Sequence, residues 1–525
     1  MNNNGKRLLW VDDEIEFLRS HIMFMEEHGY VVEKATNGDD AVAMIKSKPY
    51  DLVLLDEQMA GKDGLSTLEE IKEYDQSIPV VMVTKSEEER LMEAALGRNI
   101  NGYLIKPVNP SQILSVCKSI LHSRAIRSNH VTSAYVRELS ENKSNLMTNL
   151  LPSKWEKIYF SLCKWDNDLL ALSDQGLEET HQGQKKEVAK KFITYVEENY
   201  VSWFGKKGGN PNICTQALKR KVVPLLKKGD KVCLLVMAGF RVDQWLAIMP
   251  LLEQYFKCEN AMSWSLLPSE KTNCRVGLFS GQSPREVSLK QPQMWKKMQE
   301  EEDKAPYERE LLRMNLRING VDIEEPKILH LRQPEDSQKL AEDIGKYDEE
   351  QLLTVVVEFF DMLNQLRRES SLLKEIVPDE KGFRELAKTW FKSSKLFEIL
   401  RLFAERGRTV VLTSDHGTVL VDSPAEVFCQ EEKTPNPRVK IGQNISCDER
   451  HALFVETPVQ YGLPGEVGEV AYAIAKDNYY FVYPNKFQYF VTQFKGQMVG
   501  GGLSIEELLI PLVTMTPKPP AEPAA

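Results

Sequence analysis

The stretch LVLLDEQMAGKDG, from Leu52 to Gly64, carries the clearest signal of a fold. Four consecutive apolar residues end on Asp56, and a polar loop with two glycines follows. A short, uninterrupted apolar run bounded by turn residues is typical of a strand that is buried on both faces of a parallel sheet. The carboxylate of Asp56 is therefore predicted to lie at the carboxyl end of such a strand.

Similar segments lie on both sides of this stretch. Apolar runs predict further strands at Leu8–Val11, Val31–Ala35, Val80–Val83 and Tyr103–Ile105. Helical spacing predicts helices between them, on the face formed by Ile15, Leu18, Ile22 and Met25, at Glu87–Leu96, and at Ile113–Leu121. Five strand–helix repeats predict an α/β fold with a doubly wound five-stranded sheet over residues 1–123. Ligands bind such sheets at the carboxyl ends of the strands.

Polar residues lie at that edge after four of the five predicted strands. Asp12 and Asp13 follow the first strand, Asp56 the third, Thr84 the fourth and Lys106 the fifth. Three converging carboxylates repel each other unless a cation joins them, and Mg²⁺ suits oxygen ligands. A carboxylate beside that metal can attack phosphorus, while a hydroxyl and an ammonium stabilise the phosphoryl oxygens. Any one of the five residues could be a solvated loop residue, but their joint placement favours a site.

Residues 6–122 resemble the receiver domain of two-component response regulators. The resemblance implies that a histidine kinase phosphorylates Asp56 and that Asp12 and Asp13 complete a Mg²⁺ site with it. It further implies that Thr84 and Lys106 bind the phosphoryl group and that Tyr103 is the family's rotating aromatic residue.

The loop after Asp56 keeps the family's Met59 and Gly64 but has Ala60 where proline is usual. The family's output surface, which comprises the fourth helix, the fifth strand and the fifth helix, often mediates dimerisation. A homodimer that depends on phosphorylation is therefore expected.

Composition narrows the class of protein. The chain has 525 residues, which predicts roughly three or four domains. Its net charge of −10 and the absence of a basic block argue against DNA binding. The N-terminus is too polar for a signal peptide, and no run approaches the roughly 18 apolar residues of a membrane span. Eight cysteines without a C-x-x-C pair predict reduced thiols in a cytoplasmic protein.

The middle of the chain lacks strand signals. Helices are predicted at 124–149, 155–173 and 178–204, and they would form a helical linker bundle over residues 124–205 that relays the state of the receiver. A Gly- and Pro-containing loop at 206–211 marks the next boundary. A tail rich in proline and alanine, residues 517–525, is predicted to be disordered.

Residues 206–516 are predicted to form a second α/β domain. Strands are expected at Val232–Met237 and Thr409–Thr413, a strand or strand-to-helix segment at Gln351–Phe360, and an aromatic hairpin at Tyr479–Tyr483 and Phe487–Gln493. The phrases GFRVDQW, EFFDML, TSDHG and GGLSIEELLIP resemble the PglZ domain of the alkaline phosphatase superfamily. Receiver, helical linker and PglZ domain in this order resemble the PorX response regulators, which are associated with type IX secretion.

Active members of that superfamily use two zinc ions and a Thr or Ser nucleophile. The family's ligand pattern is matched by Asp361, Asp415 and His416. Three other ligand positions and the nucleophile position hold different residues, namely Ala238, Gln365, Gly500 and Lys271. Thr272 lies one residue beyond the nucleophile position, and Ser269 lies two before it. His330 and His451 have no ligand-type spacing.

A catalytic zinc needs about three protein ligands and an open position, so neither zinc site is complete. We therefore expect a domain without two-zinc phosphoesterase chemistry that binds a protein or a nucleotide-like ligand. In it, Lys271 would pair with Asp361 and Asp415, and Asp415-His416 would be a structural pair. The alternative is an active zinc-dependent phosphodiesterase or phosphatase, controlled by receiver phosphorylation, with Thr272 as the nucleophile.

Overall fold

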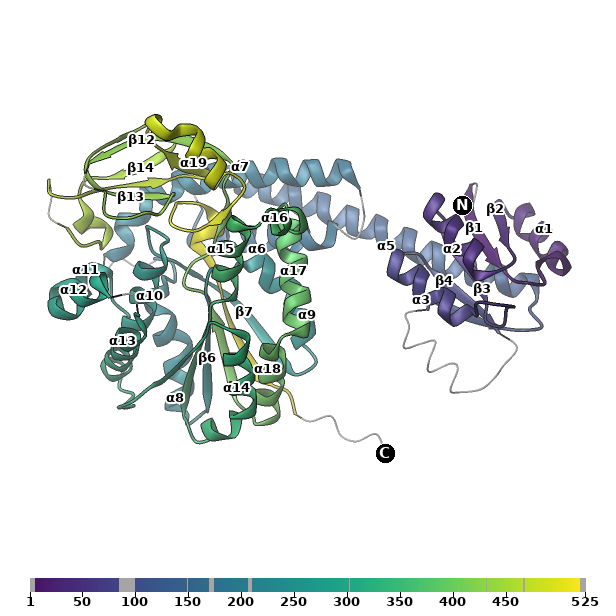
Figure 1. Cartoon of the computed structure of the whole chain (residues 1–525), viewed down its shortest axis with the longest axis horizontal. Helices are drawn as coiled ribbons and strands as arrows, with labels where there is room; N and C mark the ends of the chain where they lie inside the picture. Colours follow the sequence, from purple (N-terminus) through teal and green to yellow (C-terminus); the bar gives the residue numbers. More distant parts are fainter. Residues whose placement is uncertain are drawn as a thin grey trace. The chain divides into compact units, whose positions relative to one another are not determined.

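The computed structural model describes residues 5–84, 100–148, 150–169, 174–205, 210–301, 303–430, 432–465 and 468–519. For residues 122–130 and 371 it describes the backbone only. The chain divides into two compact units, Met1–Glu138 and Leu139–Ala525 (Figure 1). The predicted helix at Glu87–Leu96 lies outside the described residues, as do residues 206–209 of the predicted boundary loop.

The first unit contains the predicted five-stranded parallel sheet. Its strands lie in the order β2, β1, β3, β4 and β5, which is the order of a doubly wound sheet. Their bounds are β1 (Lys6–Val11), β2 (Tyr30–Ala35), β3 (Leu52–Asp56), β4 (Val80–Thr84) and β5 (Gly102–Ile105). All four pairings are parallel, so the carboxyl ends of the strands share one edge.

Alternation along the strands sends neighbouring side chains to opposite faces of this sheet. Leu9 and Leu55 pack with α2 (Gly38–Ser47) and α3 (Gly64–Tyr74) on one face. Leu8 and Leu54 pack with α1 (Arg19–Glu27) and the first turns of α5 on the other. Both faces are therefore covered, which explains why the strands are apolar runs instead of alternating patterns.

The last receiver helix does not end where the sequence suggested. Helices predicted separately at Ile113–Leu121 and 124–149 are one continuous helix, α5 (Pro110–Asn145). The segment after Pro110 contains neither proline nor glycine, so nothing in it interrupts the backbone hydrogen bonds. The predicted domain boundary at residue 123 thus falls inside a helix.

The other linker helices are α6 (Pro152–Asp168) and α7 (Gln175–Asn199). They do not form a bundle with a core of its own, because their aromatic residues pack on the C-terminal domain. The rings of Phe192 and Trp264 stack with centroids 5.4 Å apart, and Trp203 meets Trp264 edge-on at 5.1 Å. Trp264 also donates a 2.8 Å hydrogen bond to Glu156 on α6. Residues 139–205 therefore belong to the second unit.

The second unit is built on a six-stranded mixed sheet in the order β7, β18, β10, β6, β9 and β8. Strands β10, β6, β9 and β8 run parallel, whereas β18 is antiparallel to both β10 and β7. Their bounds are β6 (Val232–Met237), β7 (Phe256–Trp264), β8 (Lys327–Leu331), β9 (Leu352–Val357), β10 (Thr409–Thr413) and β18 (Leu509–Pro517). The strands predicted at 232–237 and 409–413 are confirmed, and 351–360 is a strand followed by a helix.

Helices lie on both sides of this sheet (Figure 1). One face is packed by α9 (Val242–Leu252), α14 (Pro334–Glu342), α17 (Glu380–Ser393) and α18 (Lys395–Glu405). The other is packed by α8 (Val223–Lys227), α10 (Lys271–Ser280) and α13 (Ala305–Ile318). The remaining helices are α11 (Pro284–Lys290), α12 (Pro292–Glu300), α15 (Phe359–Glu369), α16 (Ser371–Ile376), α19 (Phe487–Phe494) and α20 (Ile505–Leu508).

A second sheet has the order β14, β15, β13, β12 and β16, and β11 pairs with β17. The bounds are β11 (Val419–Leu420), β12 (Ser423–Gln430), β13 (Val439–Cys447), β14 (Ala452–Val455), β15 (Ala471–Ala475), β16 (Tyr479–Val482) and β17 (Met498–Val499). The predicted aromatic hairpin is wrong in its second arm, which is the helix α19. Its apolar residues follow helical spacing and pack back on Tyr480 and Val482, while β16 pairs with β12.

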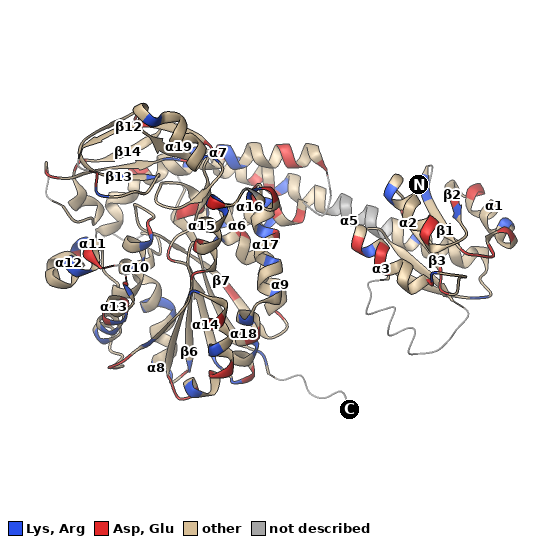
Figure 2. Ribbon diagram, in the orientation of Figure 1, with Lys and Arg blue, Asp and Glu red and all other residues tan. Residues whose placement is uncertain are grey.

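The chain remains ordered beyond the predicted start of the tail. Pro517 pairs with Phe256, and the amide of Lys518 donates to the carbonyl of Tyr255 at 2.8 Å. Residues 520–525 lie outside the described part. Acidic and basic residues are interspersed along the helices (Figure 2). Within the described residues, no helix is long and apolar enough to cross a membrane.

Candidate functional sites

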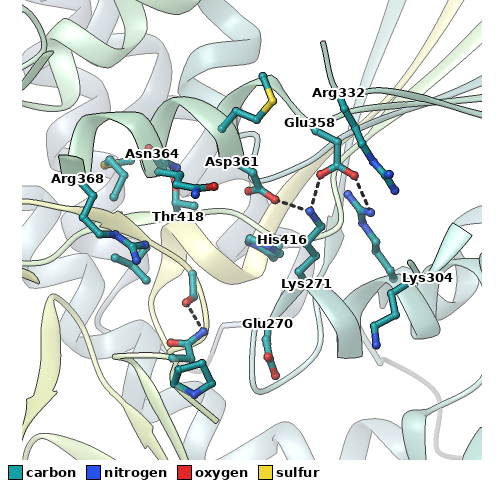
Figure 3. Close-up of a pocket in the computed structure, with 18 of the residues that line it drawn as sticks. Glu270, Lys271, Lys304, Arg332, Glu358, Asp361, Asn364, Arg368, His416 and Thr418 are labelled. Atoms are coloured by element: carbon teal, nitrogen blue, oxygen red, sulfur yellow. Dashed lines mark hydrogen bonds and ion pairs between the residues drawn. The ribbon is translucent and has the colours of Figure 1, made fainter. Parts of the chain in front are cut away.

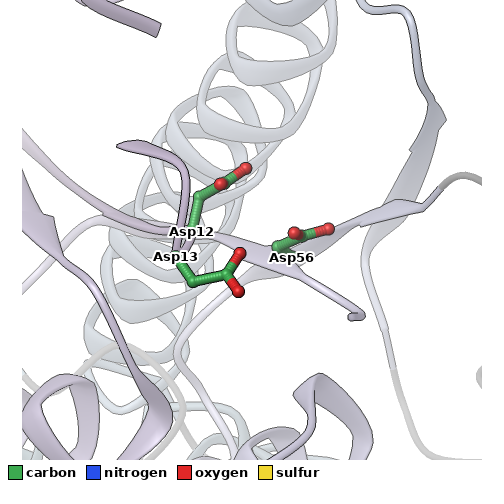
Figure 4. Close-up of side chains that lie close together, drawn as sticks. All are labelled: Asp12, Asp13 and Asp56. Atoms are coloured by element: carbon green, nitrogen blue, oxygen red, sulfur yellow. The ribbon is translucent and has the colours of Figure 1, made fainter. Parts of the chain in front are cut away.

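Three carboxylates converge at the carboxyl edge of the receiver sheet. Asp12 and Asp13 follow β1 and Asp56 ends β3, and their ligand oxygens all lie within 4.8 Å of one another (Figure 4). Asp12 and Asp56 are buried, and Asp13 is exposed. In the described part of the chain this is the only group of three acidic, His or Cys side chains with that spacing. An all-oxygen donor set of this charge fits Mg²⁺.

Lys106, which follows β5, lies against this cluster. Its ammonium is 2.8 Å from Asp12 Oδ2 and 2.9 Å from Asp56 Oδ2. Burial raises the pKa of Asp56, and Asp12 and Asp13 raise it further, while Lys106 opposes them. Burial works against the charge on Lys106, but its hydrogen bonds to both carboxylates raise the pKa of its ammonium. One fixed cation therefore faces three carboxylates.

The loop after Asp56 is held by local backbone contacts. A Cβ atom at Gly64 would lie 2.2 Å from the carbonyl oxygen of Asp56, so only glycine fits there. Asp63 caps α3 by accepting from the amide of Ser66 at 2.7 Å. The amide of Ala60 donates to Asp13 Oδ2 at 3.2 Å. Proline has no such N–H, so the departure from the family pattern at this position supplies a donor to the cluster.

The remaining receiver residues also lie near this edge. The hydroxyl of Thr84, at the end of β4, donates to the carboxylate of Glu57. Tyr103 lies on β5 with 36% of its surface exposed. The sequence thus predicted correctly which residues the strand ends bring to this edge, and it missed Glu57 as the partner of Thr84.

A cavity of about 780 Å³ lies in the second unit (Figure 3). Four of the positions taken from the zinc pattern line it, namely Asp361, Gln365, His416 and Gly500. Lys271, at the nucleophile position, lines it as well. The parallel strands β6, β9 and β10 end at one edge of the sheet, which explains why residues so far apart in sequence meet here.

Two glycines show how closely these positions approach each other. A Cβ atom at Gly239, next to Ala238, would lie 2.9 Å from Asp361 Oδ1. A Cβ atom at Gly500 would lie 2.7 Å from His416 Nδ1. Any side chain at position 500, histidine included, would therefore displace the ring of His416.

Lys271 and Arg275 extend two cations from α10 toward the carboxylates of this cavity. They are four residues apart and therefore share a face of the helix. Lys271 pairs with Glu358 and lies 2.9 Å from Asp361 Oδ2 (Figure 3). Arg275 Nε lies 2.9 Å from Asp415 Oδ2.

Arg275 also joins carboxylates from two further elements. Its Nη1 lies 3.0 Å from Glu358 Oε1 and 3.2 Å from Glu308 Oε1 on α13. We call Lys271, Arg275, Glu308, Glu358, Asp361 and Asp415 the effector cluster. His330 on β8 adjoins it, with Nε2 3.2 Å from Glu308 Oε2.

The predicted pairing of Lys271 is right for Asp361 and wrong for Asp415. The direct partner of Asp415 is Arg275, which sequence reasoning missed. Asp415 is fully buried, and its Oδ1 accepts from the amides of Gly239 at 3.0 Å and of His416 at 2.8 Å. The carboxylate is thus surrounded by donors from three segments.

The two hydroxyl residues near Lys271 do not line the cavity. Ser269 is buried and hydrogen-bonds to the backbone of Gly501 and Gly502. Thr272 follows Lys271 on α10 and does not belong to the cavity wall. In this arrangement the side chain that enters the cavity from the nucleophile region is the ammonium of Lys271.

The charges of the effector cluster stabilise one another. Desolvation opposes ionisation of Glu358, but the neighbouring His330 and the charges of Arg275 and Lys271 lower its pKa. Desolvation likewise works against Arg275, yet Asp415, Glu308 and Glu358 raise the pKa of its guanidinium. His330 loses basicity through burial, but Glu308 and Glu358 raise its pKa above the usual value.

Sequence reasoning missed three residues of this region, namely Arg275, Glu308 and Glu358, and it named His330 only as a histidine without ligand-type spacing. Glu358 is the first letter of the phrase EFFDML and could have been noticed there. The spacing of Lys271 and Arg275 on one helix face was a second available signal. Glu308 and His330 lie on elements without any motif, so only the tertiary fold brings them in.

The comparisons with known proteins agree with this architecture. The family model of the BREX system PglZ alkaline phosphatase-like domain matches residues 217–515, more than half of the chain. The chain belongs to the PglZ family. Ahead of the PglZ domain, residues 8–118 match the response regulator receiver domain, and residues 125–204 match the PorX response regulator linker domain. The PglZ domain is thus the effector of a two-component response regulator, which confirms the resemblance.

The curated relatives ResD and CheY each match a minor part of the chain. The transcriptional regulatory protein ResD of Bacillus subtilis is 33% identical over 118 residues, which are 22% of this chain and 49% of ResD. The chemotaxis protein CheY of Halobacterium salinarum is 33% identical over 118 residues, which are 22% of this chain and 98% of CheY. A CheY-like receiver domain structure from Methanospirillum hungatei is 29% identical and covers 23% of this chain and 98% of its own, with a TM-score of 0.23.

The sequence matches relate the acidic cluster to the metal site of receiver domains. The chain spans about half the length of ResD and nearly all of CheY. Receiver domains bind Mg²⁺ through an acidic pocket, and Asp12, Asp13 and Asp56 form such a pocket here.

Proposed function

We propose that a histidine kinase phosphorylates this protein on Asp56, with Mg²⁺ held by Asp12, Asp13 and Asp56. The observation that carries the proposal is the contact of one ammonium, that of Lys106, with both Asp12 and Asp56 at the end of parallel strands. This contact supports a site in which carboxylates converge and one cation lies close enough to bind a phosphoryl group.

In the transfer, a carboxylate oxygen of Asp56 attacks the phosphorus of a phosphohistidine. The O–P bond forms while the P–N bond breaks, and the imidazole leaves with the electron pair and takes up a proton. Lys106 then binds a phosphoryl oxygen, and the hydroxyl of Thr84 turns from Glu57 to a second one. Bound Mg²⁺ supplies further positive charge for the phosphoryl oxygens.

Labelling with a small phosphodonor in the presence of Mg²⁺ tests this assignment. The acyl phosphate should map to Asp56 and be absent from Asp56→Asn. Asp75→Asn, which changes a carboxylate outside the cluster, is the control and should label like the wild type. Equal labelling of Asp56→Asn and the wild type would refute the assignment.

We further propose that phosphorylation changes self-association or docking of the receiver. Tyr103 lies on β5 and Lys106 follows it, β5 belongs to the family's output surface, and the side chain of Tyr103 is exposed. Light scattering and small-angle X-ray scattering with and without a beryllofluoride mimic would detect it. An unchanged mass and shape at micromolar concentration would contradict this proposal.

For the PglZ domain, we propose that two-zinc phosphoesterase chemistry is lost. Lys271 and Arg275 supply two fixed positive charges and bind oxygens of Asp361, Glu358 and Asp415. A zinc ion at Asp415 would have to displace the guanidinium of Arg275 from a fully buried carboxylate. The contrasting function, an active zinc-dependent phosphodiesterase or phosphatase, requires that displacement.

The cavity retains cations that can hold an anionic ligand. Arg332, Lys304 and Arg368 line it together with His416 (Figure 3). Within the described chain, the guanidinium of Arg368 has no hydrogen bond or ion pair. A volume of about 780 Å³ suits a ligand of nucleotide size, so the domain would bind such a ligand, or an acidic protein segment, without cleaving it.

Metal analysis and an activity assay on one sample separate the two functions. Zinc-saturated protein should show no phosphodiester or phosphomonoester turnover above a His416→Ala control, and less than one tightly bound zinc per chain. Turnover that His416→Ala abolishes would overturn the proposal, and Thr272→Ala would then test the nucleophile.

A further inference from the structure

A second cavity of about 510 Å³ lies in the same unit, away from the effector cluster. Helix α7 forms one wall through Lys185 and its neighbours, and α17 forms another through Glu380 and Arg384. The loop between β15 and β16 contributes Asp477, and α20 contributes Glu506. Seven carboxylates line the cavity against four Lys and Arg residues.

Most of the buried charges beside this cavity are already matched. Lys185 lies 3.0 Å from Asp166 Oδ2 and 3.3 Å from Glu380 Oε2. Arg241 lies 2.7 Å from Glu380 Oε1 and 2.9 Å from Asp243 Oδ1.

A third cation completes this set. Arg384 lies 3.3 Å from Asp243 Oδ2. Three cations thus neutralise three carboxylates in one closed network. Outside this network the described wall of the cavity holds five carboxylates and only two cations, Lys186 and Lys381.

Glu506 and Asp477 on the cavity wall lie outside this network. Among the described residues, neither carboxylate has a salt bridge or a hydrogen bond to another side chain. Burial and the nearby Glu380 raise the pKa of Glu506 to about 7. Burial also raises the pKa of Asp477, whose backbone adopts a positive φ of 47° in the turn. Both groups would gain from a cation that arrives from outside the chain.

We propose that this cavity is a second ligand site that binds a cationic group, an ammonium or a guanidinium, through Glu506 and Asp477. The ligand is either a free polyamine or a basic side chain of another protein, because both carry this group. Neither Asp56 nor any residue of the effector cluster lines this cavity.

The position of the site connects the linker to the first cavity. Glu380 binds Lys185 of α7 and also Arg241, whose Nη1 donates to the carbonyl of Thr418 at 3.1 Å. Thr418 lines the first cavity. A cation beside Glu506 therefore acts next to a network that joins a linker helix to the wall of the effector cavity.

Isothermal titration of the full chain tests the site with three probes. Spermidine represents a free polyamine, and Nα-acetyl-arginine amide represents a protein side chain. Nα-acetyl-citrulline amide has the shape of the arginine probe without its charge. At least one cationic probe should bind and the citrulline probe should not, and the cationic probe that binds identifies the source.

Two variants locate the binding. Glu506→Gln should lower the affinity for the cationic probe at least tenfold, and Asp477→Asn should lower it severalfold. His416→Ala, which changes the first cavity, should bind like the wild type. Thermal melting of Glu506→Gln verifies its folding. We expect no fall in its melting temperature, because a carboxylate without an ion pair is replaced by a neutral group.

Proton linkage gives an independent readout. Cation binding should lower the pKa of Glu506, so at pH 7 binding should release protons, and affinity should rise between pH 6 and pH 8. Glu506→Gln should remove both effects. Absence of binding by spermidine and by the arginine probe at millimolar concentration would overturn the proposal. So would equal binding of the citrulline probe or undiminished binding by Glu506→Gln.

Discussion

The receiver cluster and the effector cluster occupy the same kind of place, the carboxyl edge of a sheet with parallel strands, yet they balance charge differently. In the receiver, Lys106 alone faces Asp12, Asp13 and Asp56, which leaves negative charge for a divalent ion. In the effector, Lys271 and Arg275 hold four carboxylates from three elements. The number of fixed cations, more than the number of acidic residues, decides whether such an edge remains open to metal.

The largest effect should come from removing Arg275, because its guanidinium lies 2.9 Å from Asp415 Oδ2, closer than His416, whose Nε2 lies 3.8 Å from Oδ1. Arg275→Met would leave Asp415 buried without that charge, and loss of one partner of a buried pair destabilises by about 3–5 kcal/mol. Urea unfolding of the full chain, followed through the second unit's transition, would measure the change.

Arg313→Met is the matched control for that variant. Arg313 also lies in the PglZ domain and pairs with Glu310, but both side chains are largely solvated. Exposed pairs contribute at most about 1 kcal/mol, so this variant should melt close to the wild type. Similar losses in the two variants would show that the effector cluster is not held by its buried cation.

Removing the single cation of the receiver should act in the opposite direction on metal binding. Lys106→Met would leave Asp12 and Asp56 with no ammonium between them, and Mg²⁺ affinity should rise about tenfold or more, given the strength of charge interactions near a protein surface. Quenching of Trp10, which lies on β1 next to the cluster, would report the titration. Lys62→Met changes a cation that pairs with Asp39 and Glu70, and it should leave the affinity unchanged.

An unchanged Mg²⁺ affinity in Lys106→Met would show that the fixed cation does not limit metal binding in the receiver. The corresponding change in the effector cluster, Arg275→Met, should not create a zinc site. The carboxylates of this cluster come from separate elements and should repel one another once the cation is lost. Zinc analysis of that variant would test this expectation.

The two clusters also differ in how far the sequence predicts them. The receiver cluster follows from apolar runs that each end in a polar residue, since strand ends in a parallel sheet meet at one edge. Asp361, Asp415 and His416 were found through the resemblance to the family's ligand pattern, and of these Asp361 and His416 line the cavity while Asp415 is fully buried. Arg275 was missed because it lies on a helix, and a helix has no comparable rule that fixes which strand end it approaches.

Glu308 was missed, and His330 was not assigned to this cluster, for a related reason. Glu308 lies in the middle of α13 and His330 on β8 at the edge of the sheet, and neither belongs to a motif. The continuity of α5 was missed because the linker was treated as a separate domain, although no helix-breaking residue separates it from the receiver. Tertiary packing and domain assignment, more than local propensity, limited the prediction.

His330 should make the stability of the PglZ domain sensitive to pH. Its pKa is raised above the usual 6.5 by Glu308 and Glu358, against burial and the charge of Arg275. The stabilisation is therefore complete below pH 6.5 and is lost as the pH rises through the folded-state pKa. The melting temperature of the second unit should fall as the pH rises through that range, and this fall should be smaller in His330→Gln. Identical pH profiles for the variant and the wild type would exclude His330 as the cause.

The smallest effect should come from the loop that supports Asp13. The amide of Ala60 donates to Asp13 Oδ2 at 3.2 Å, and both residues are solvated. Ala60→Pro removes this donor and leaves the carboxylate freer to bind metal, so Mg²⁺ affinity should rise by about two- to threefold, within the modest energy of a solvated hydrogen bond. Ala60→Ser keeps the N–H and should bind Mg²⁺ like the wild type. If Ala60→Pro and Ala60→Ser behave alike, the backbone donor has no part in tuning the cluster, and the charge of Lys106 alone sets its affinity.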